Sequence, residues 1–144
     1  MKIRGKHMKI DKRLYKYIEY EMYHYKDYKK EIQNMREEIL EGSPSPSDGQ
    51  PKGTTAGNPT ENKVLKLSMS VGLSAMEKTV KCIDSALSSL SERHRKIFDM
   101  IYIKRRKDRY SMSDELFISY DTLNRNKNEL VEAVGKELGV IKDF

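Results

Sequence analysis

The sequence feature that most constrains the fold is an apolar repeat in the middle of the chain. Between residues 69 and 90, apolar side chains recur at alternating spacings of four and three residues without a break. These positions are Met69, Leu73, Met76, Val80, Ile83, Leu87 and Leu90. The spacing puts them on one face of a helix, so it predicts a long helix packed along a single seam. Asn58 suits the N-cap and Pro59 the first turn, with Glu61 completing a capping box, so we expect this helix to cover residues 59–90.

A similar repeat precedes it. Ile18, Tyr25, Ile32 and Ile39 recur every seven residues in a stretch without proline or glycine. This predicts one continuous helix over residues 11–41, after a loose basic arm at residues 1–10. Tyrosines outside the seam, such as Tyr15, are expected on its flanks with their hydroxyls in water.

Residues 42–58 hold four of the eight glycines and three of the four prolines, which predicts a flexible linker. The linker is long enough for the two helices to fold back on each other as an antiparallel hairpin. A coiled coil between two chains is equally compatible with the pattern, so self-association through the long helices is expected as one of two arrangements.

Residues 91–144 show the pattern of a separate three-helix domain. Ser91 and Ser119 are suitable N-caps, and Gly139 suits the C-terminal end of the last helix. Met112 and Leu116 share one helical face, and the next helix carries Leu123, Leu130, Val134 and Leu138 on one side. Helices joined by so short a turn must cross steeply, which predicts a helix-turn-helix.

Two residues depart from the usual helix-turn-helix pattern. Phe117 stands where a turn glycine is common, and Asn126 stands where an apolar residue is common. An ordinary helical hairpin with polar surfaces is therefore the alternative interpretation. Either way, 37% hydrophobic and 35% charged residues, with no alternating segment long enough for a sheet, predict an all-α protein: a long helical hairpin or coiled coil plus this C-terminal domain.

Polar side chains at the start of the last helix indicate DNA contact. Arg125 and Asn128 are the best base-reading candidates, arginine for guanine and asparagine for adenine. Ser119, Tyr120 and Thr122 would contact phosphate at the helix N-terminus. The further candidates on this helix are Asp121, Asn124 and Lys127.

The densest basic run of the chain lies just before this motif. Lys104, Arg105, Arg106 and Arg109 could hold the phosphate backbone, and the alternative is a solvated loop without a partner. The net charge of +6 and the pI near 9.3 also favour a polyanionic partner, double-stranded DNA above all.

Other classes of function find little support in the sequence. The single Cys82 excludes an internal disulfide and fits a reducing cytoplasm. No apolar run approaches the roughly 18 residues that span a bilayer, so no membrane partner is expected. No metal-ligand spacing, phosphate-binding glycine loop or nucleophile motif is present, so we expect no catalytic residue, cofactor or metal, and not an enzyme.

Three stretches together resemble a known family. NPTENKVLKL, LSERHRKIFDMIY and LFISYDTLNRNKNEL are similar to RinA/ArpU-type transcriptional regulators of bacteriophages and prophages. The C-terminal part also resembles the promoter-reading region 4 of bacterial sigma factors. The resemblance implies an activator of late genes, including those for DNA packaging, that acts with host RNA polymerase in the cytoplasm of a Gram-positive host. It also implies that the major groove is faced by Tyr120, Asp121, Thr122, Asn124, Arg125 and Asn128.

Two other functions are compatible with the same elements. A phage small terminase subunit also joins a helix-turn-helix to an oligomerising helical region, but it binds the DNA packaging site. A sigma-like or anti-sigma factor would bind RNA polymerase and have little affinity for free DNA.

Overall fold

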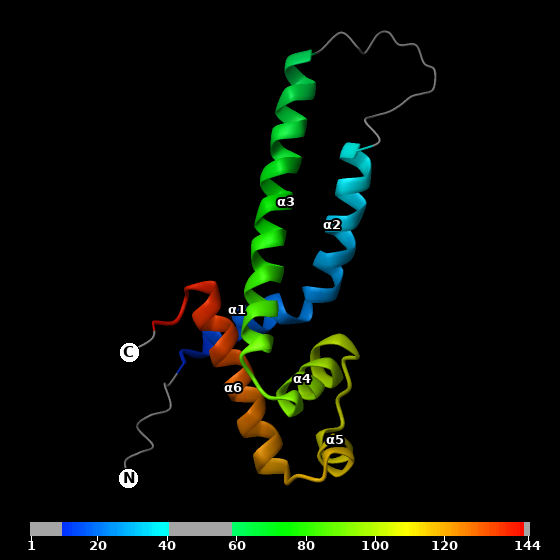
Figure 1. Cartoon of the computed structure of the whole chain (residues 1–144). Coiled ribbons are helices and arrows are strands. Elements are labelled where there is room, and N and C mark those ends of the chain that lie inside the picture. The colour runs from blue at the N-terminus through cyan, green and yellow to red at the C-terminus, as the bar shows by residue number, and fades with distance from the viewer. Residues whose placement is uncertain (1–9, 41–58, 143–144) are drawn as a thin grey trace. The chain divides into compact units, whose positions relative to one another are not determined.

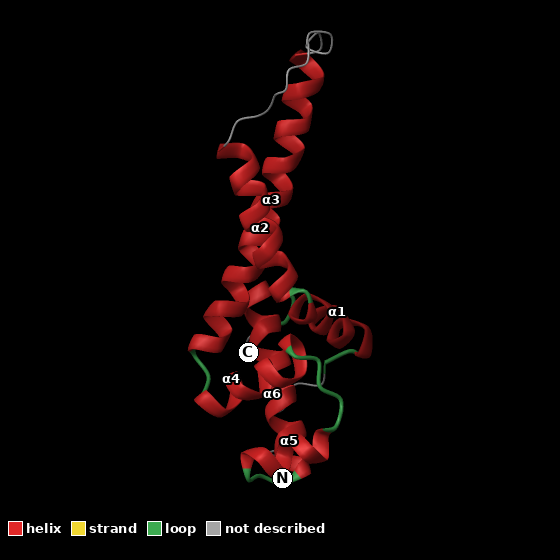
Figure 2. Ribbon diagram, turned by 90° about the vertical axis from the view of Figure 1, so that its right-hand side faces the viewer, coloured by secondary structure: helices red, strands yellow, loops and turns green. Residues whose placement is uncertain are grey.

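The computed structural model of the chain describes residues 10–40 and 59–142, and within them every regular element is helical (Figures 1 and 2). This confirms the all-α prediction. The elements are α1 (Lys12–Tyr23), α2 (Tyr25–Leu40), α3 (Pro59–Ser88), α4 (Glu92–Phe98), the π-helical turn η4 (Asp99–Ile103), α5 (Arg109–Leu116) and α6 (Tyr120–Leu138). The predicted arm, most of the linker and the Asn58 cap lie outside the described residues.

The first predicted helix is divided at His24. The amide of His24 donates to the carbonyl oxygens of Tyr20 and Glu21 at 3.1 and 3.2 Å, and α2 begins at the next residue. One continuous helix over residues 11–41 was therefore wrong. Ile18 and Met22 of α1 are fully buried against C-terminal elements, chiefly α6 and η4. A heptad spacing records which side chains are buried but not which partner buries them, so it could not reveal this division.

The chain forms two compact units whose limits differ from the predicted domains. Residues 1–25 and 81–144 form one unit, hereafter the core unit, and residues 26–80 form the other, the hairpin unit. The predicted boundaries at residues 41 and 90 therefore separate α1 and the end of α3 from the C-terminal helices with which they pack. The reason is that α1 and α3 supply apolar side chains that the short C-terminal helices need for a core.

The hydrophobic core of the core unit draws on all its helices. Its buried apolar residues are Ile18, Met22, Ile83, Ala86, Ile97, Phe98, Ile101, Tyr102, Met112, Leu123, Leu130, Val131, Val134 and Ile141. Aromatic rings cross it: Phe98 lies 5.5 Å from Tyr102 and 5.4 Å from Tyr25, measured between ring centroids. Of the apolar faces predicted for the last two helices, Met112, Leu123, Leu130 and Val134 are buried and Leu116 and Leu138 are half-buried.

Three predicted helix ends agree with the structure. Ser91 and Ser119 cap α4 and α6 by accepting from backbone amides three residues on, and Gly139 ends α6 at φ +82°. Asp108, which the sequence analysis did not single out, caps α5 by accepting from the amides of Tyr110 and Ser111. These ends need only residues close in sequence, which is why their signals were readable.

In the hairpin unit, α2 and α3 are joined by an ion pair between Arg36 and Glu77, in which Nε donates to Oε2 at 2.9 Å. Ile32 and Met35 of α2, and Leu73 and Met76 of α3, are half-buried. Leu65 and Leu67, near the start of α3, are exposed. None of the helices in the described parts of the chain has the length and apolar character to cross a membrane.

Candidate nucleic-acid interface

The candidate site is built by α5, a turn of residues 117–119, and α6. Figure 1 shows α5 nearly end-on while α6 runs close to the plane of the picture, so the two helices cross steeply. Met112 of α5 and Leu123 of α6 are fully buried beneath the turn. One face of the N-terminal part of α6, hereafter the free face, carries exposed side chains and is bordered by Tyr15 of α1 and Arg109 of α5.

Phe117 occupies the turn position where glycine is usual. Its backbone is left-handed, at φ 58° and ψ 44°, and its side chain is 93% exposed. The amide of Ile118 donates to the carbonyl oxygen of Ser113 at 3.0 Å, which closes the end of α5. The backbone therefore makes the turn that glycine would make. This left-handed conformation is strained for phenylalanine, which has a Cβ.

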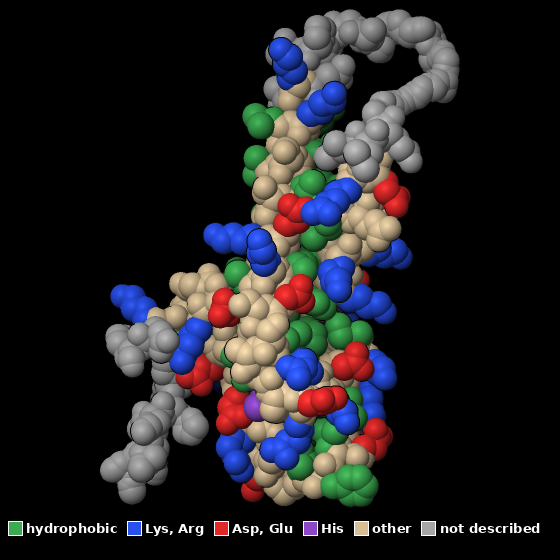
Figure 3. Space-filling model, in the orientation of Figure 1, with side chains coloured by type: hydrophobic (Ala, Val, Ile, Leu, Met, Phe, Trp, Pro, Cys, Tyr) green, Lys and Arg blue, Asp and Glu red, His purple; other side chains and the backbone are tan. Residues whose placement is uncertain are grey.

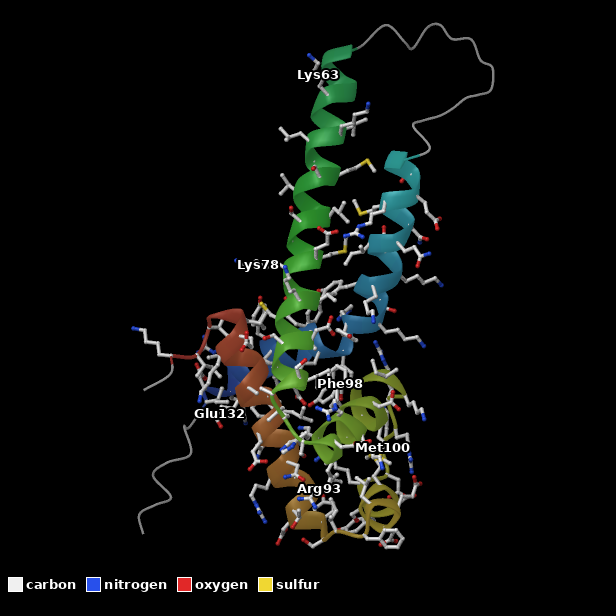
Figure 4. The ribbon with its side chains drawn as sticks, in the orientation of Figure 1. Lys63, Lys78, Arg93, Phe98, Met100 and Glu132 are labelled. Carbon is white, nitrogen blue, oxygen red and sulfur yellow. The ribbon has the colours of Figure 1, made fainter. Side chains whose placement is uncertain are left out.

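Asn126 occupies the other unusual position, and it is 4% exposed. Its Oδ1 accepts from Nε of Arg93 at 2.9 Å, and its Nδ2 donates to Oε1 of Glu129 at 3.0 Å. His94 lies 2.7 Å from the same Glu129 oxygen. Arg93 stands at the start of α4, close to α6 (Figure 4). Polar pairing between α4 and α6 thus replaces the apolar contact expected here.

Asp121, Arg125 and Asn128 project from the free face of α6, with Thr122 and Asn124 half-buried beside them. A hollow of about 500 Å³ runs along this face, and Ile10 and Tyr15 close its other side. Ser119 is occupied as the N-cap: its Oγ accepts from the Thr122 amide at 3.0 Å. Tyr120 stacks on Tyr110 with the ring centroids 4.4 Å apart. The structure therefore brings most of the predicted α6 residues to one surface.

Lys127 is the exception on α6, because it is only 8% exposed. Its Nζ lies 3.0 Å from a carboxylate oxygen of Glu19 and donates to the Tyr15 hydroxyl at 3.1 Å. The hydroxyl of Tyr102 donates to the same Glu19 oxygen at 2.6 Å. The ammonium of Lys127 thus joins α6 to α1, and its contact with DNA stays a prediction.

The basic run is also largely occupied within the core unit. Nη2 of Arg105 donates to the carbonyl oxygen of Tyr23 at 3.0 Å. Arg106 forms a two-pronged ion pair with Glu115, at 3.0 and 2.6 Å, which holds the pKa of that carboxyl below its ordinary value. Lys104 is 64% exposed and lies 3.4 Å from Asp99. Arg105 and Arg106 are thus engaged within the core unit while Lys104 and Lys107 are exposed, and contact of the run with phosphate stays a prediction.

Arg109 and Tyr15 make contacts at the site other than those predicted for them. Arg109 was expected at phosphate, but its Nη1 donates to Oδ1 of Asn124 at 2.8 Å. Tyr15 was expected with its hydroxyl in water, but it donates to Oδ1 of Asn128 at 2.6 Å. The pairing of Tyr15 with a residue 113 positions away has no signal in the local sequence pattern.

The charges of the core unit are mixed rather than separated. Figure 3 shows Lys and Arg side chains interspersed with Asp and Glu over the part of the surface formed by α4, α5 and α6. On the free face of α6 itself, Arg125 is accompanied by Asp121. In the parts of the chain that the structure describes, no three histidine, cysteine or acidic side chains form a group that could hold a metal ion.

Comparison with known proteins gives a family. No curated protein and no solved structure matches the chain. A family described as "Protein of unknown function (DUF722)" matches residues 7–136, which include α1 and nearly all of α6. The chain therefore belongs to this DUF722 family.

Proposed function

We propose that this protein is a sequence-specific DNA-binding regulator of transcription, with α5 and α6 acting as a helix-turn-helix. The observation that carries the proposal is the free face of α6, where Asp121, Arg125 and Asn128 are exposed on a helix held firmly from behind. An α-helix fits the major groove of B-DNA, and side chains of these types hydrogen-bond base edges.

The charge distribution bears on how such a protein would bind. Arg105, Arg106 and Lys127 are engaged within the core unit, so these three cations are less available to neutralise phosphates. Lys107 is exposed and has no ion pair with a described residue, so it is a better phosphate candidate than its neighbours. We therefore expect a shallow salt dependence, since each neutralised phosphate adds about 0.9 to the slope.

The biological setting follows from the sequence resemblance to RinA/ArpU-type regulators. It supports a role in phage or prophage development, as an activator of late genes that works with host RNA polymerase. The long helices would then provide self-association or the polymerase contact. The resemblance of the C-terminal part to sigma-factor region 4 supports promoter DNA as the target.

The test is binding of the purified protein to tiled fragments of its genome, measured by fluorescence anisotropy. On the tightest fragment, Arg125→Ala should lose roughly 1–3 kcal/mol and relax the preference at one base pair. Lys63→Ala removes the same charge from an exposed site on α3 in the hairpin unit and should bind as the wild type does (Figure 4).

Three results would contradict the proposal in different ways. Equal losses for both variants on every sequence would remove the base-reading role of α6. Tight binding at the DNA packaging site instead of a promoter would favour a small terminase subunit. No binding to free DNA, with capture of the protein by host RNA polymerase, would favour a sigma-like factor.

A further inference from the structure

Two asparagines on the free face of α6 are held in the same way. Asn124 and Asn128 lie four residues apart, so they follow each other along one side of the helix. In each, the side-chain oxygen accepts a hydrogen bond from a residue of the core unit, at 2.8 and 2.6 Å. In neither does the side-chain nitrogen have a partner among the described residues.

For Asn124 the direction of the hydrogen bond is fixed by its partner. Its partner is the guanidinium of Arg109, which has five N–H donors and no acceptor. Only the oxygen of the Asn124 amide can meet a donor, so the amide cannot be turned over without breaking the bond. The NH₂ group therefore points away from Arg109.

For Asn128 the direction of the hydrogen bond depends on the Tyr15 hydroxyl, which lies between Asn128 and Lys127. A lysine ammonium can only donate, so the Tyr15 oxygen accepts from Lys127 at 3.1 Å. The hydroxyl hydrogen of Tyr15 is then free to be donated onward, and its nearest partner is Asn128 at 2.6 Å. The structure accordingly has the oxygen of the Asn128 amide on the Tyr15 side, and its NH₂ group points away.

The hydrogen bonds from Glu19 through Lys127 and Tyr15 to Asn128, hereafter the relay, begin at a buried ion pair. Lys127 is held by the carboxylate of Glu19 at 3.0 Å, and that carboxylate also accepts from Tyr102 at 2.6 Å. The side chains of Lys127 and Glu19 are only 11% and 19% exposed, so neither can be released into water without leaving the other charge unpaired. Lys127 is also placed over the ring of Tyr15, 5.0 Å from its centroid.

We propose that the free face of α6 is a hydrogen-bond-donor surface that reads guanine, with Tyr15 and Arg109 as the positioning residues that make it so. Asn124, Arg125 and Asn128 then offer donors. Three carboxylates line the same hollow. Glu129 is paired with His94 and Asn126, and Glu132 is paired with Lys136, so Asp121 is the acidic acceptor beside the donors. Guanine is the base whose major-groove edge presents two acceptors, N7 and O6.

This inference rests on the proposed DNA-binding function and makes it more specific. It also revises the adenine preference expected for Asn128. Bidentate contact with adenine needs the amide oxygen and nitrogen side by side toward the base, because adenine offers an acceptor at N7 and a donor at N6. An oxygen directed at Tyr15 disfavours that arrangement.

The first experiment uses the free full-length protein and needs no DNA. The side-chain NH₂ signals of Asn128 are followed by NMR in the wild type, in Tyr15→Phe and in Tyr20→Phe. Tyr20 lies on the same helix and is 55% exposed, which makes it the matched control. We expect the Asn128 signals to move in Tyr15→Phe only. Unchanged signals in Tyr15→Phe would overturn the relay whatever the protein binds.

The second experiment measures base preference on the tightest genomic fragment. Asn128→Ala identifies the base pair that Asn128 reads, and each of the four bases is then placed there. The wild type and Tyr20→Phe should prefer guanine over adenine by about tenfold. Tyr15→Phe keeps the aromatic ring but frees the amide to turn, so this preference should fall to about twofold or reverse.

The outcomes separate this inference from the function on which it rests. Sequence-specific binding with adenine preferred by the wild type, or with a guanine preference unchanged in Tyr15→Phe, would overturn the inference and leave the function standing. Absence of any sequence-specific binding by the wild type would overturn the proposed function, and the guanine-reading role would fall with it.

Discussion

Glycines at positions 72 and 135 both interrupt long helices, but their surroundings differ. A Cβ added at Gly72 would meet nothing within 4 Å. At Gly135 it would lie 2.7 Å from Cδ1 of Ile18 and 2.9 Å from Cγ1 of Ile141. Gly135 is thus where α1 and the chain after α6 approach the helix closely, whereas Gly72 has no such role.

This difference predicts opposite effects of alanine on stability. Gly72→Ala should raise the free energy of unfolding by about 1 kcal/mol, because alanine favours helix. Gly135→Ala should lower it by about 1 kcal/mol, since crowding of buried isoleucines outweighs the same helical gain. Urea unfolding followed by circular dichroism would measure both. An equal gain in the two variants would mean that α1 does not pack closely at Gly135.

Position on the helix, and not residue identity, decides what two asparagines of α6 do. Asn124 and Asn126 are two positions apart on α6, yet one lies at the free face and the other is buried beneath Arg93. A pattern of polar residues alone cannot separate these cases, because an asparagine buried with all its partners satisfied costs little. The departure at position 126 was visible in the sequence, but Arg93, 33 positions away, was not visible as its explanation.

Among the elements, the turn between α5 and α6 contains a residue with a strained backbone. Phe117 is left-handed and 93% exposed, so its side chain gains little by packing while its backbone is strained. Strained residues of this kind cluster at functional sites, and Phe117 lies next to the surface for which we propose DNA binding.

Substitutions of Phe117 separate the strain of its backbone from any contact that its ring makes. Phe117→Gly should raise the free energy of unfolding by about 1 kcal/mol, because glycine adopts φ near +58° without strain. Phe117→Ala retains the Cβ and should show little gain. Thermal unfolding of the three proteins gives the comparison. Lower stability in Phe117→Gly would show that the exposed ring makes a stabilising contact.

At the scale of the molecule, the core unit is assembled from segments that lie far apart in sequence. Tyr102 of η4 is 1% exposed and donates to Glu19 of α1, 83 positions earlier. Burial, together with the hydrogen bond to the Glu19 carboxylate and its negative charge, raises the pKa of the Tyr102 hydroxyl far above its ordinary value. The neutral hydroxyl is therefore part of what holds α1 in place.

The raised pKa predicts a loss of stability in alkali. Below pH about 10 Tyr102 is protonated in both the folded and the unfolded chain, so its contribution is complete. Above that pH the unfolded chain loses this proton and the folded protein keeps it, so the free energy of unfolding falls by up to about 1.4 kcal/mol per pH unit.

Urea unfolding between pH 9 and pH 11, in steps of about half a unit, would measure this slope. The slope of stability against pH should be shallower in Tyr102→Phe than in the wild type, even though the variant is less stable throughout. Tyr20→Phe, whose hydroxyl lies on an exposed side chain, serves as the control and should keep the wild-type slope. Equal slopes in all three proteins would mean that Tyr102 titrates as freely in the folded state as in water.

By itself the sequence determined the helical class, the apolar faces of the last two helices and the caps at Ser91, Ser119 and Gly139. These depend on residues within a turn or two of each other, so spacing and residue type suffice. Only the tertiary structure decided the division at His24, the joining of α1 to the C-terminal helices and the use of Lys127 inside the core unit. Those outcomes depend on which distant segment supplies the burying surface or the hydrogen-bond partner, and a single helix's pattern holds no record of that choice.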